Sequence, residues 1–194
     1  MLSKEENSPA FVFKICLIGS GGVGKTCIAK RLCFNTFDAN TQLTIGIDFY
    51  TYNIPILIKN KESVVRLTIW DFGGQEQFKK LFGYYIEGAN GIFLVFELTN
   101  IESLTKLSWW YEQIENHKLE SRPKILIGTK MDLVKSVNRK SKIDDLIIEQ
   151  FLNNHNVKDF YKTSSKENIN ILYSFKQMTK LLLNCHKLDY DKIL

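Results

Sequence analysis

Hydrophobic and polar residues are arranged along the chain in segments that favour either strands or amphipathic helices. Strands are expected where β-branched and aromatic residues form short runs, and helices where apolar residues recur every three or four positions. The expected strands cover residues 15–18, 47–58, 64–70, 91–98, 124–128 and 159–162. The expected helices are one that contains Ile28 and Leu32, and four over residues 77–87, 103–118, 142–153 and 168–186.

The order of these elements indicates an α/β fold. The strands at 47–58 and 64–70 flank a short polar segment and are expected to form an antiparallel hairpin, whereas helices separate the other strands. Strands that alternate with helices favour a parallel sheet covered on both faces. We therefore predict a three-layer α/β fold, with a six-stranded, mostly parallel sheet, one antiparallel edge strand and about five helices. The chain is divided into a flexible segment over 1–10, one domain over 11–187 and a short tail over 188–194.

The last predicted helix carries an apolar stripe that has two interpretations. The stripe consists of Ile171, Phe175, Met178 and Leu182, at helical spacing. Such a stripe can attach a helix to a membrane, but it much more often faces the core of a globular domain. We therefore expect this helix to pack against the sheet.

Composition excludes several classes of protein. Of the 194 residues, 44% are hydrophobic and 24% are charged, which is typical of one globular domain rather than a disordered or membrane protein. The net charge is +5, but basic residues are interspersed with acidic ones, so no nucleic-acid binding is expected. The four cysteines show no C-x-x-C spacing, which favours reduced structural thiols. No apolar run resembles a signal peptide or a membrane helix, so we expect a cytoplasmic location.

A glycine-rich segment connects the first predicted strand to the first helix. It reads GSGGVGKT from Gly19 to Thr26 and matches the phosphate-binding pattern G-x-x-x-x-G-K-[ST] in the required position. The glycines let successive backbone N–H groups face phosphates, Lys25 is expected to reach the terminal phosphates, and Thr26 offers a hydroxyl to Mg²⁺. An ordinary glycine-rich turn is the alternative, but the full pattern is rare by chance. Phosphate binding is therefore expected.

A second motif, DFGGQE, starts with Asp71 at the end of the strand over 64–70. A carboxylate at this place is suited to Mg²⁺, and a following glycine, Gly74, can bring its backbone N–H to the terminal phosphate. Gln75 would then orient the attacking water. Alone, Asp-x-Gly-Gly is as readily an ordinary turn. The phosphate-binding loop upstream favours the functional interpretation.

Together with three further motifs, these segments resemble the Ras superfamily of small GTPases. DFGGQ is similar to the D-x-x-G-Q motif of that family, TIGIDF from Thr44 to the first switch of Rab proteins, TKMD from Thr129 to the guanine motif N/T-K-x-D, and SSK from Ser164 to the S-A-K motif. The resemblance covers residues 12–183 and implies the P-loop NTPase fold, with a GTPase domain over 11–187. It implies a switch that binds GTP with Mg²⁺ and hydrolyses it slowly to GDP.

The resemblance also implies roles for single residues. Asp132 would accept hydrogen bonds from the N1–H and the 2-amino group of guanine, donors that adenine lacks. Phe37 would lie beside the base, although a core position is the alternative for a phenylalanine. The implied catalytic residues are Gln75, Lys25, Thr44 and Gly74, and the implied metal ligands are Thr26, Thr44 and Asp71. The implied nucleotide-binding residues are Gly21, Gly22, Val23, Gly24, Lys25, Thr26, Cys27, Phe37, Thr44, Gly74, Thr129, Lys130, Asp132, Ser164, Ser165 and Lys166.

Several positions depart from the family pattern. Thr129 replaces the commoner Asn of the guanine motif, so a hydroxyl stands in place of a side-chain amide. Phe72 and Gly73 replace the Thr-Ala pair of most Ras and Rab proteins and give a G-G-Q sequence similar to that of Arf proteins. We expect this pair to make the second switch more mobile. The final residues contain no C-a-a-X box, so no lipidation motif supports membrane association.

The family resemblance further implies an effector, an exchange factor and a GTPase-activating protein as partners. Phe49, Trp70 and Tyr85 resemble the aromatic triad by which Rab surfaces meet effectors. No arginine lies near a switch in the sequence, and Arg31 on the first helix is expected to point away from the γ-phosphate. Slow hydrolysis, accelerated by an arginine from a partner, is therefore expected.

Two other functions stay open at this point. One is a scaffold that holds GTP or GDP constitutively with little hydrolysis. The other is an adenylate or small-molecule kinase, which would share the phosphate-binding loop. A kinase of that kind would not be expected to carry Thr44, Gln75 and Asp132 together. The scaffold is disfavoured because the residues implied in hydrolysis and metal binding are all present.

Overall fold

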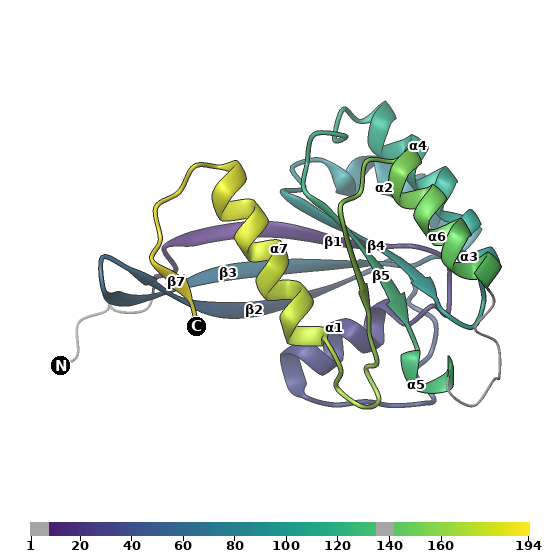
Figure 1. The fold of residues 1–194 in the computed structure, drawn as a ribbon, viewed down its shortest axis with the longest axis horizontal. Helices are drawn as coiled ribbons and strands as arrows, with labels where there is room; N and C mark the ends of the chain where they lie inside the picture. Colours follow the sequence, from purple (N-terminus) through teal and green to yellow (C-terminus); the bar gives the residue numbers. More distant parts are fainter. Residues whose placement is uncertain (1–7, 135–141) are drawn as a thin grey trace.

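The structure is a computed structural model, and it describes residues 8–134 and 142–194 (Figure 1). Its strands are β1 (Phe11–Ile18), β2 (Ile47–Ile58), β3 (Lys61–Phe72), β4 (Gly91–Glu97), β5 (Lys124–Thr129), β6 (Asp159–Lys162) and β7 (Lys192–Ile193). Its helices are α1 (Lys25–Phe34), α2 (Lys79–Ile86), α3 (Glu102–Thr105), α4 (Leu107–Asn116), α5 (Met131–Val134), α6 (Lys142–Asn154) and α7 (Ile171–Cys185), with a 3₁₀ turn over Glu76–Phe78. Most of the predicted segment of residues 1–10 lies outside the described residues.

Within the described ranges, the strands form one sheet in the order β6-β5-β4-β1-β3-β2-β7. β1 pairs in parallel with β3 and β4, and β5 and β6 continue the parallel arrangement. β2 pairs antiparallel with β3, as the hairpin prediction required. The α/β fold and the mostly parallel sheet are therefore confirmed.

The sheet has one strand more than the six expected. β7 comes from the predicted tail and pairs antiparallel with β2, so that Ile193 lies opposite Ile56. The backbone N–H of Asp191 donates to the Leu57 carbonyl at 2.8 Å, and that of Leu194 to the Pro55 carbonyl at 2.9 Å. A two-residue strand has no sequence pattern of its own, and only the open edge of β2 makes this pairing possible.

The β2–β3 hairpin connects the two segments that the sequence assigns to the switches. Its turn consists of Lys59 and Asn60, whose φ angles of 50° and 61° are those of a two-residue hairpin turn. At the opposite end, the register places Ile47 across from Phe72. The residues just before β2 therefore meet the residues just after β3, which brings Thr44 close to the DFGGQ motif.

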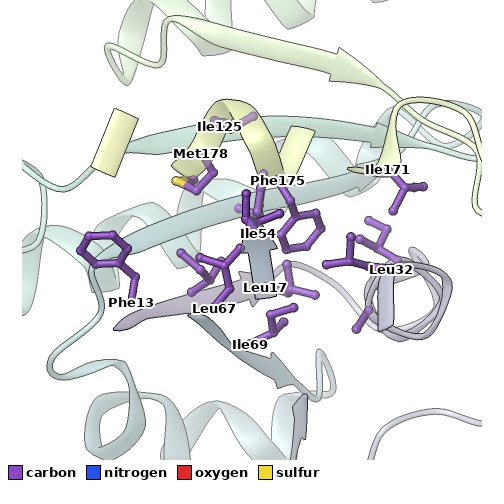
Figure 2. Close-up of a cluster of buried hydrophobic side chains, with 14 of the residues drawn as sticks. Phe13, Leu17, Leu32, Ile54, Leu67, Ile69, Ile125, Ile171, Phe175 and Met178 are labelled. Carbon is purple, nitrogen blue, oxygen red and sulfur yellow. The ribbon is translucent and has the colours of Figure 1, made fainter. Parts of the chain in front are cut away.

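Helices cover both faces of the sheet and enclose two clusters of buried side chains. On one face, α1 and α7 pack on the sheet, and Phe175 and Met178 of α7 point into the cluster shown in Figure 2. On the other face, α2, α4 and α6 cover a second cluster that includes Phe82 and Trp110. All four residues of the apolar stripe on α7 are buried, as the core-facing interpretation predicted. None of the described helices has the length and hydropathy needed to cross a membrane.

Some helix bounds differ from the predicted ones. The helix expected over residues 103–118 is divided into α3 and α4 at Lys106. The ψ of Lys106 is −14°, which departs from the value of about −42° in a regular α-helix. The last helix starts at Ile171 rather than at residue 168, because Asn168 and Asn170 adopt positive φ angles of 55° and 58°. The short helix α5 was not predicted and follows directly on β5 and Lys130.

Candidate functional site

The phosphate-binding loop lies between the end of β1 and the start of α1. Gly22 and Gly24 have φ angles of 76° and 98°, a region that a residue with a Cβ atom rarely adopts. Lys25 is the first residue of α1 and is buried, and its Nζ donates to the carbonyls of Gly19 and Ser20, both at 2.8 Å. Burial lowers the pKa of Lys25 to about 8, although the Asp71 carboxylate partly opposes this shift. The loop is thus wrapped around one buried cation.

Three oxygen-bearing side chains converge beside this loop from three separate segments. The Thr26 hydroxyl donates to Asp71 Oδ2 at 2.6 Å, and the Thr44 hydroxyl lies 2.7 Å from the Thr26 hydroxyl and 3.3 Å from Asp71 Oδ2. Asp71 is buried, and its Oδ1 has no hydrogen-bond partner. Burial raises the pKa of Asp71 to about 6, while Lys25 and the hydroxyl of Thr26 lower it. An unpaired buried carboxylate oxygen next to two hydroxyls is a donor set that fits Mg²⁺.

The two glycines of the DFGGQ motif bring the switch segments close to each other and to the phosphate-binding loop. The Gly73 N–H donates to the Gly46 carbonyl at 2.8 Å. A Cβ atom on Gly73 would lie 2.7 Å from the Thr44 carbonyl oxygen, and one on Gly74 only 2.3 Å from the Gly21 nitrogen. In the structure these glycines permit close packing, and the added mobility of the second switch stays a prediction.

A cavity of about 70 Å³ lies where these segments meet. It is lined by the phosphate-binding loop, the start of α1, the segment 41–44 and the DFGGQ motif, and Gln75 is part of its wall. The Gln75 Oε1 accepts a hydrogen bond from the Gln77 side chain at 3.1 Å, beside this cavity.

A second and larger cavity, of about 350 Å³, adjoins the first. Its walls include Lys130 and Asp132 after β5, and the segment with Ser165 before α7. The Ser164 hydroxyl donates to Asp132 Oδ1 at 2.6 Å, which fixes the orientation of that carboxylate. Lys130 Nζ forms an ion pair with Glu97 Oε2 at 2.7 Å.

The structure shows where Phe37 lies, which the sequence left open, and what replaces the family's amide at Thr129. Phe37 lines the larger cavity and is 38% exposed, so it is not a core aromatic. Thr129 is buried, and its hydroxyl lies 2.6 Å from the Val23 carbonyl and 3.0 Å from the Phe96 carbonyl. The hydroxyl that replaces the family's amide therefore connects the guanine motif to the phosphate-binding loop.

The structure brings nearly all of the predicted site residues onto the walls of these two cavities. The exceptions are Val23, Asp71 and Ser164, which are buried behind the walls and bonded to the lining residues Thr129, Thr26 and Asp132.

Sequence reasoning missed several residues of the site. Five residues between Phe37 and Thr44 line the cavities, and their position between these two predicted residues could have indicated this; they are Asp38, Ala39, Thr41, Gln42 and Leu43. Glu97, the partner of Lys130, could have been found as an acidic residue at the end of a buried strand. Arg31 does not line either of the two cavities and donates from Nε to the Ser165 carbonyl at 2.6 Å, beside the larger one.

Known proteins are similar to this chain along most of its length. The model of the Ras family matches residues 14–184. The Ras-related protein Rab-10 of Diplobatis ommata is 38% identical over 173 residues, which cover 89% of this chain and 82% of that protein. The Ras-related protein Rab-15 of Rattus norvegicus is 34% identical over 93% of this chain and 81% of that protein. The GTP-binding protein ypt1 of Schizosaccharomyces pombe is 31% identical over 88% of this chain and 79% of that protein. The chain belongs to the Ras family, as a Rab-like small GTPase.

Proposed function

We propose that this small GTPase acts as a molecular switch that binds GTP and GDP across the two adjoining cavities and hydrolyses GTP in the smaller one. The cavities share Gly22, Gly24, Cys27 and Thr41 in their walls, so one extended ligand can occupy both. The smaller cavity is surrounded by the groups that suit phosphates, and the larger one by those that suit a base. The observation that carries this proposal is the orientation of Asp132 by Ser164 at the base end.

Recognition of the base follows from the chemistry of Asp132. With one oxygen held by the Ser164 hydroxyl, the carboxylate is positioned to accept from both donors on the guanine edge. Adenine has no hydrogen at N1 and no amine at C2, so the half-buried Asp132 carboxylate would face that base without a donor. Phe37 and the aliphatic part of Lys130 border the same cavity and supply apolar surface for the faces of the base.

Hydrolysis is assigned to residues of the smaller cavity. Lys25 and the N–H of Gly74 would stabilise charge on the terminal phosphate, and Gln75 would orient the attacking water. Thr26, Thr44 and Asp71 would hold Mg²⁺, which when bound neutralises charge on the phosphate oxygens. Lys79, close after the second motif, could offer a positive charge in place of an arginine, but its Nζ donates to Glu76 at 2.7 Å and lies 4.2 Å from the centre of the Trp109 ring. A partner that supplies an arginine would therefore complete the site.

The partners of the switch are proposed from the surface beside it. Phe49, Trp70 and Tyr85 lie next to one another, with ring centres 4.6 Å and 6.0 Å apart. Phe49 is 60% exposed and Tyr85 is 38% exposed. Exposed aromatic residues of this kind mark surfaces that bind other proteins. We assign this surface to an effector, and we propose a cytoplasmic location with regulators that exchange nucleotide and activate hydrolysis.

The decisive experiment is a competition titration of the nucleotide-free protein with GDP, ADP and xanthosine diphosphate. The wild type should bind GDP far more tightly than ADP, because a charged group that the base covers without offering it a hydrogen-bond donor costs about 2 kcal/mol. Asp132→Asn should shift the preference toward the xanthine nucleotide. Equal affinity for GDP and ADP would reject the proposed site. Single-turnover hydrolysis of bound GTP distinguishes the switch from a scaffold, which would leave GTP intact.

A further inference from the structure

Arg31 is a half-buried residue in the last turn of α1, and its guanidinium group binds two separate segments. Its Nε donates to the Ser165 carbonyl at 2.6 Å, and its Nη2 to the Lys166 carbonyl at 3.3 Å. Its Nη1 donates to the backbone carbonyl of Asn35 at 2.8 Å and to the Asn35 side chain at 3.1 Å. One side chain thus connects the C-terminal end of α1 to the loop before α7.

Both ends of this connection matter for the nucleotide. α1 begins with Lys25 and Thr26 at the phosphate end of the site, and Arg31 lies six residues further along the same rigid helix. Ser165 and Lys166 line the larger cavity at the base end. The contact between them therefore links the helix of the phosphate end to the segment of the base end.

We propose that Arg31 is a positioning residue for guanine recognition, which holds the Ser165–Lys166 segment at a set distance from α1. This inference rests on the proposed function, because it assumes that this segment meets the O6 side of guanine. The backbone of the segment can discriminate between the carbonyl of guanine and the amine of adenine only if it is held in place. Arg31 does not touch the nucleotide and acts through the segment.

The geometry requires an arginine rather than any cation. The guanidinium is planar, and its Nε, Nη1 and Nη2 point to acceptors on two sides at once. A lysine ammonium at the same position has the charge but can reach only part of this set. The site also suits a positive charge, because Arg31 lies at the C-terminal end of α1, where the helix carbonyls are unpaired.

The experiment compares Arg31→Met with Arg31→Lys and with the control Arg66→Met. Arg66 lies on β3, donates to the Asn53 side chain at 3.1 Å and lines neither of the two cavities. For each protein, the dissociation rate of GDP is measured by stopped flow, and the affinities for GDP and ADP by competition. Thermal unfolding of the GDP-bound proteins reports general loss of stability.

In Arg31→Met, GDP should dissociate about tenfold faster or more. The ratio of GDP affinity to ADP affinity should decrease by a similar factor. Arg31→Lys should fall between Arg31→Met and wild type, and Arg66→Met should match wild type. A purely structural role would lower the affinities for GDP and ADP together and leave their ratio unchanged, which would overturn the inference. The inference would also be overturned if Arg31→Lys released GDP at the wild-type rate and kept the wild-type ratio of GDP to ADP affinity. If the wild type itself does not prefer GDP, the proposed function fails instead.

Discussion

Replacing Gly73 by alanine tests whether the two switch segments pack as closely as the structure shows. The new Cβ atom would lie 2.7 Å from the Thr44 carbonyl oxygen, 2.9 Å from the Gly46 carbonyl oxygen and 3.1 Å from a ring carbon of Phe78. Ordinary contact begins at 3.4 Å, so the first switch must retreat by at least about 0.7 Å. Two of the three neighbours are backbone atoms, which cannot move aside as the end of a side chain can.

The expected cost follows from these contacts. Overpacking of this kind costs about 1–3 kcal/mol, and the hydrogen bond from Gly73 N–H to Gly46, if lost, adds about 1 kcal/mol. The φ of Gly73 is not in the left-handed region, so alanine can adopt it. Alanine also lowers the conformational entropy of the unfolded chain, which raises the unfolding free energy by about 0.4–1 kcal/mol. The net expectation is a loss of roughly 1–3 kcal/mol in unfolding free energy. Because Thr44 moves with the segment, GDP should also dissociate faster.

Gly83→Ala is the matched control. Gly83 lies in α2, where a Cβ atom would meet only the ring of the exposed His117, at 3.0 Å and 3.4 Å. Alanine is favoured over glycine in a helix by about 0.5–1 kcal/mol, so this variant should be as stable as wild type or more stable. Urea unfolding of the GDP-bound proteins and release of a fluorescent GDP measure both effects. If Gly73→Ala behaves like Gly83→Ala, the close packing of the switches is refuted.

Three further predictions concern chemistry and pH. Gln75→Leu should slow single-turnover GTP hydrolysis about tenfold or more, a barrier increase of about 1.4 kcal/mol, and unchanged turnover would show that Gln75 does not orient the water. Chelation of Mg²⁺ should accelerate GDP release from wild type but much less from Asp71→Asn, because this variant lacks the carboxylate; equal acceleration would argue against Asp71 as a ligand. Burial lowers the pKa of His155, whose ring lies 4.0 Å from Tyr111 and 4.4 Å from Phe151, although Glu115 partly opposes the shift. The unfolded chain then binds the proton more readily, so unfolding free energy should fall as pH drops below about 6.5, and it should fall less in His155→Gln; equal slopes in urea titrations at several pH values would contradict this.

Local patterns in the sequence were sufficient for the order of the six longer strands and of the five main helical regions, and for the motifs of the site, but not for β7 or α5. The spacing of apolar residues within one element reflects which of its faces is buried. It can therefore be recognised from residues that are close together in the sequence. The phosphate-binding loop was equally clear, because glycine is needed at Gly22 and Gly24 for their positive φ angles. The hairpin between the switches followed from two alternating runs on either side of a short polar segment.

Only the tertiary structure decided how distant segments meet. Arg31 and Ser165 are 134 positions apart, and nothing near either residue indicates the hydrogen bond between them. The pairing of β7 with β2 and the contact of Gly73 with Gly46 are of the same kind. A glycine in a sequence indicates freedom of the backbone, and whether it serves mobility or close approach depends on which atoms surround it. Those atoms come from other segments, and so the packing of the whole chain determines them.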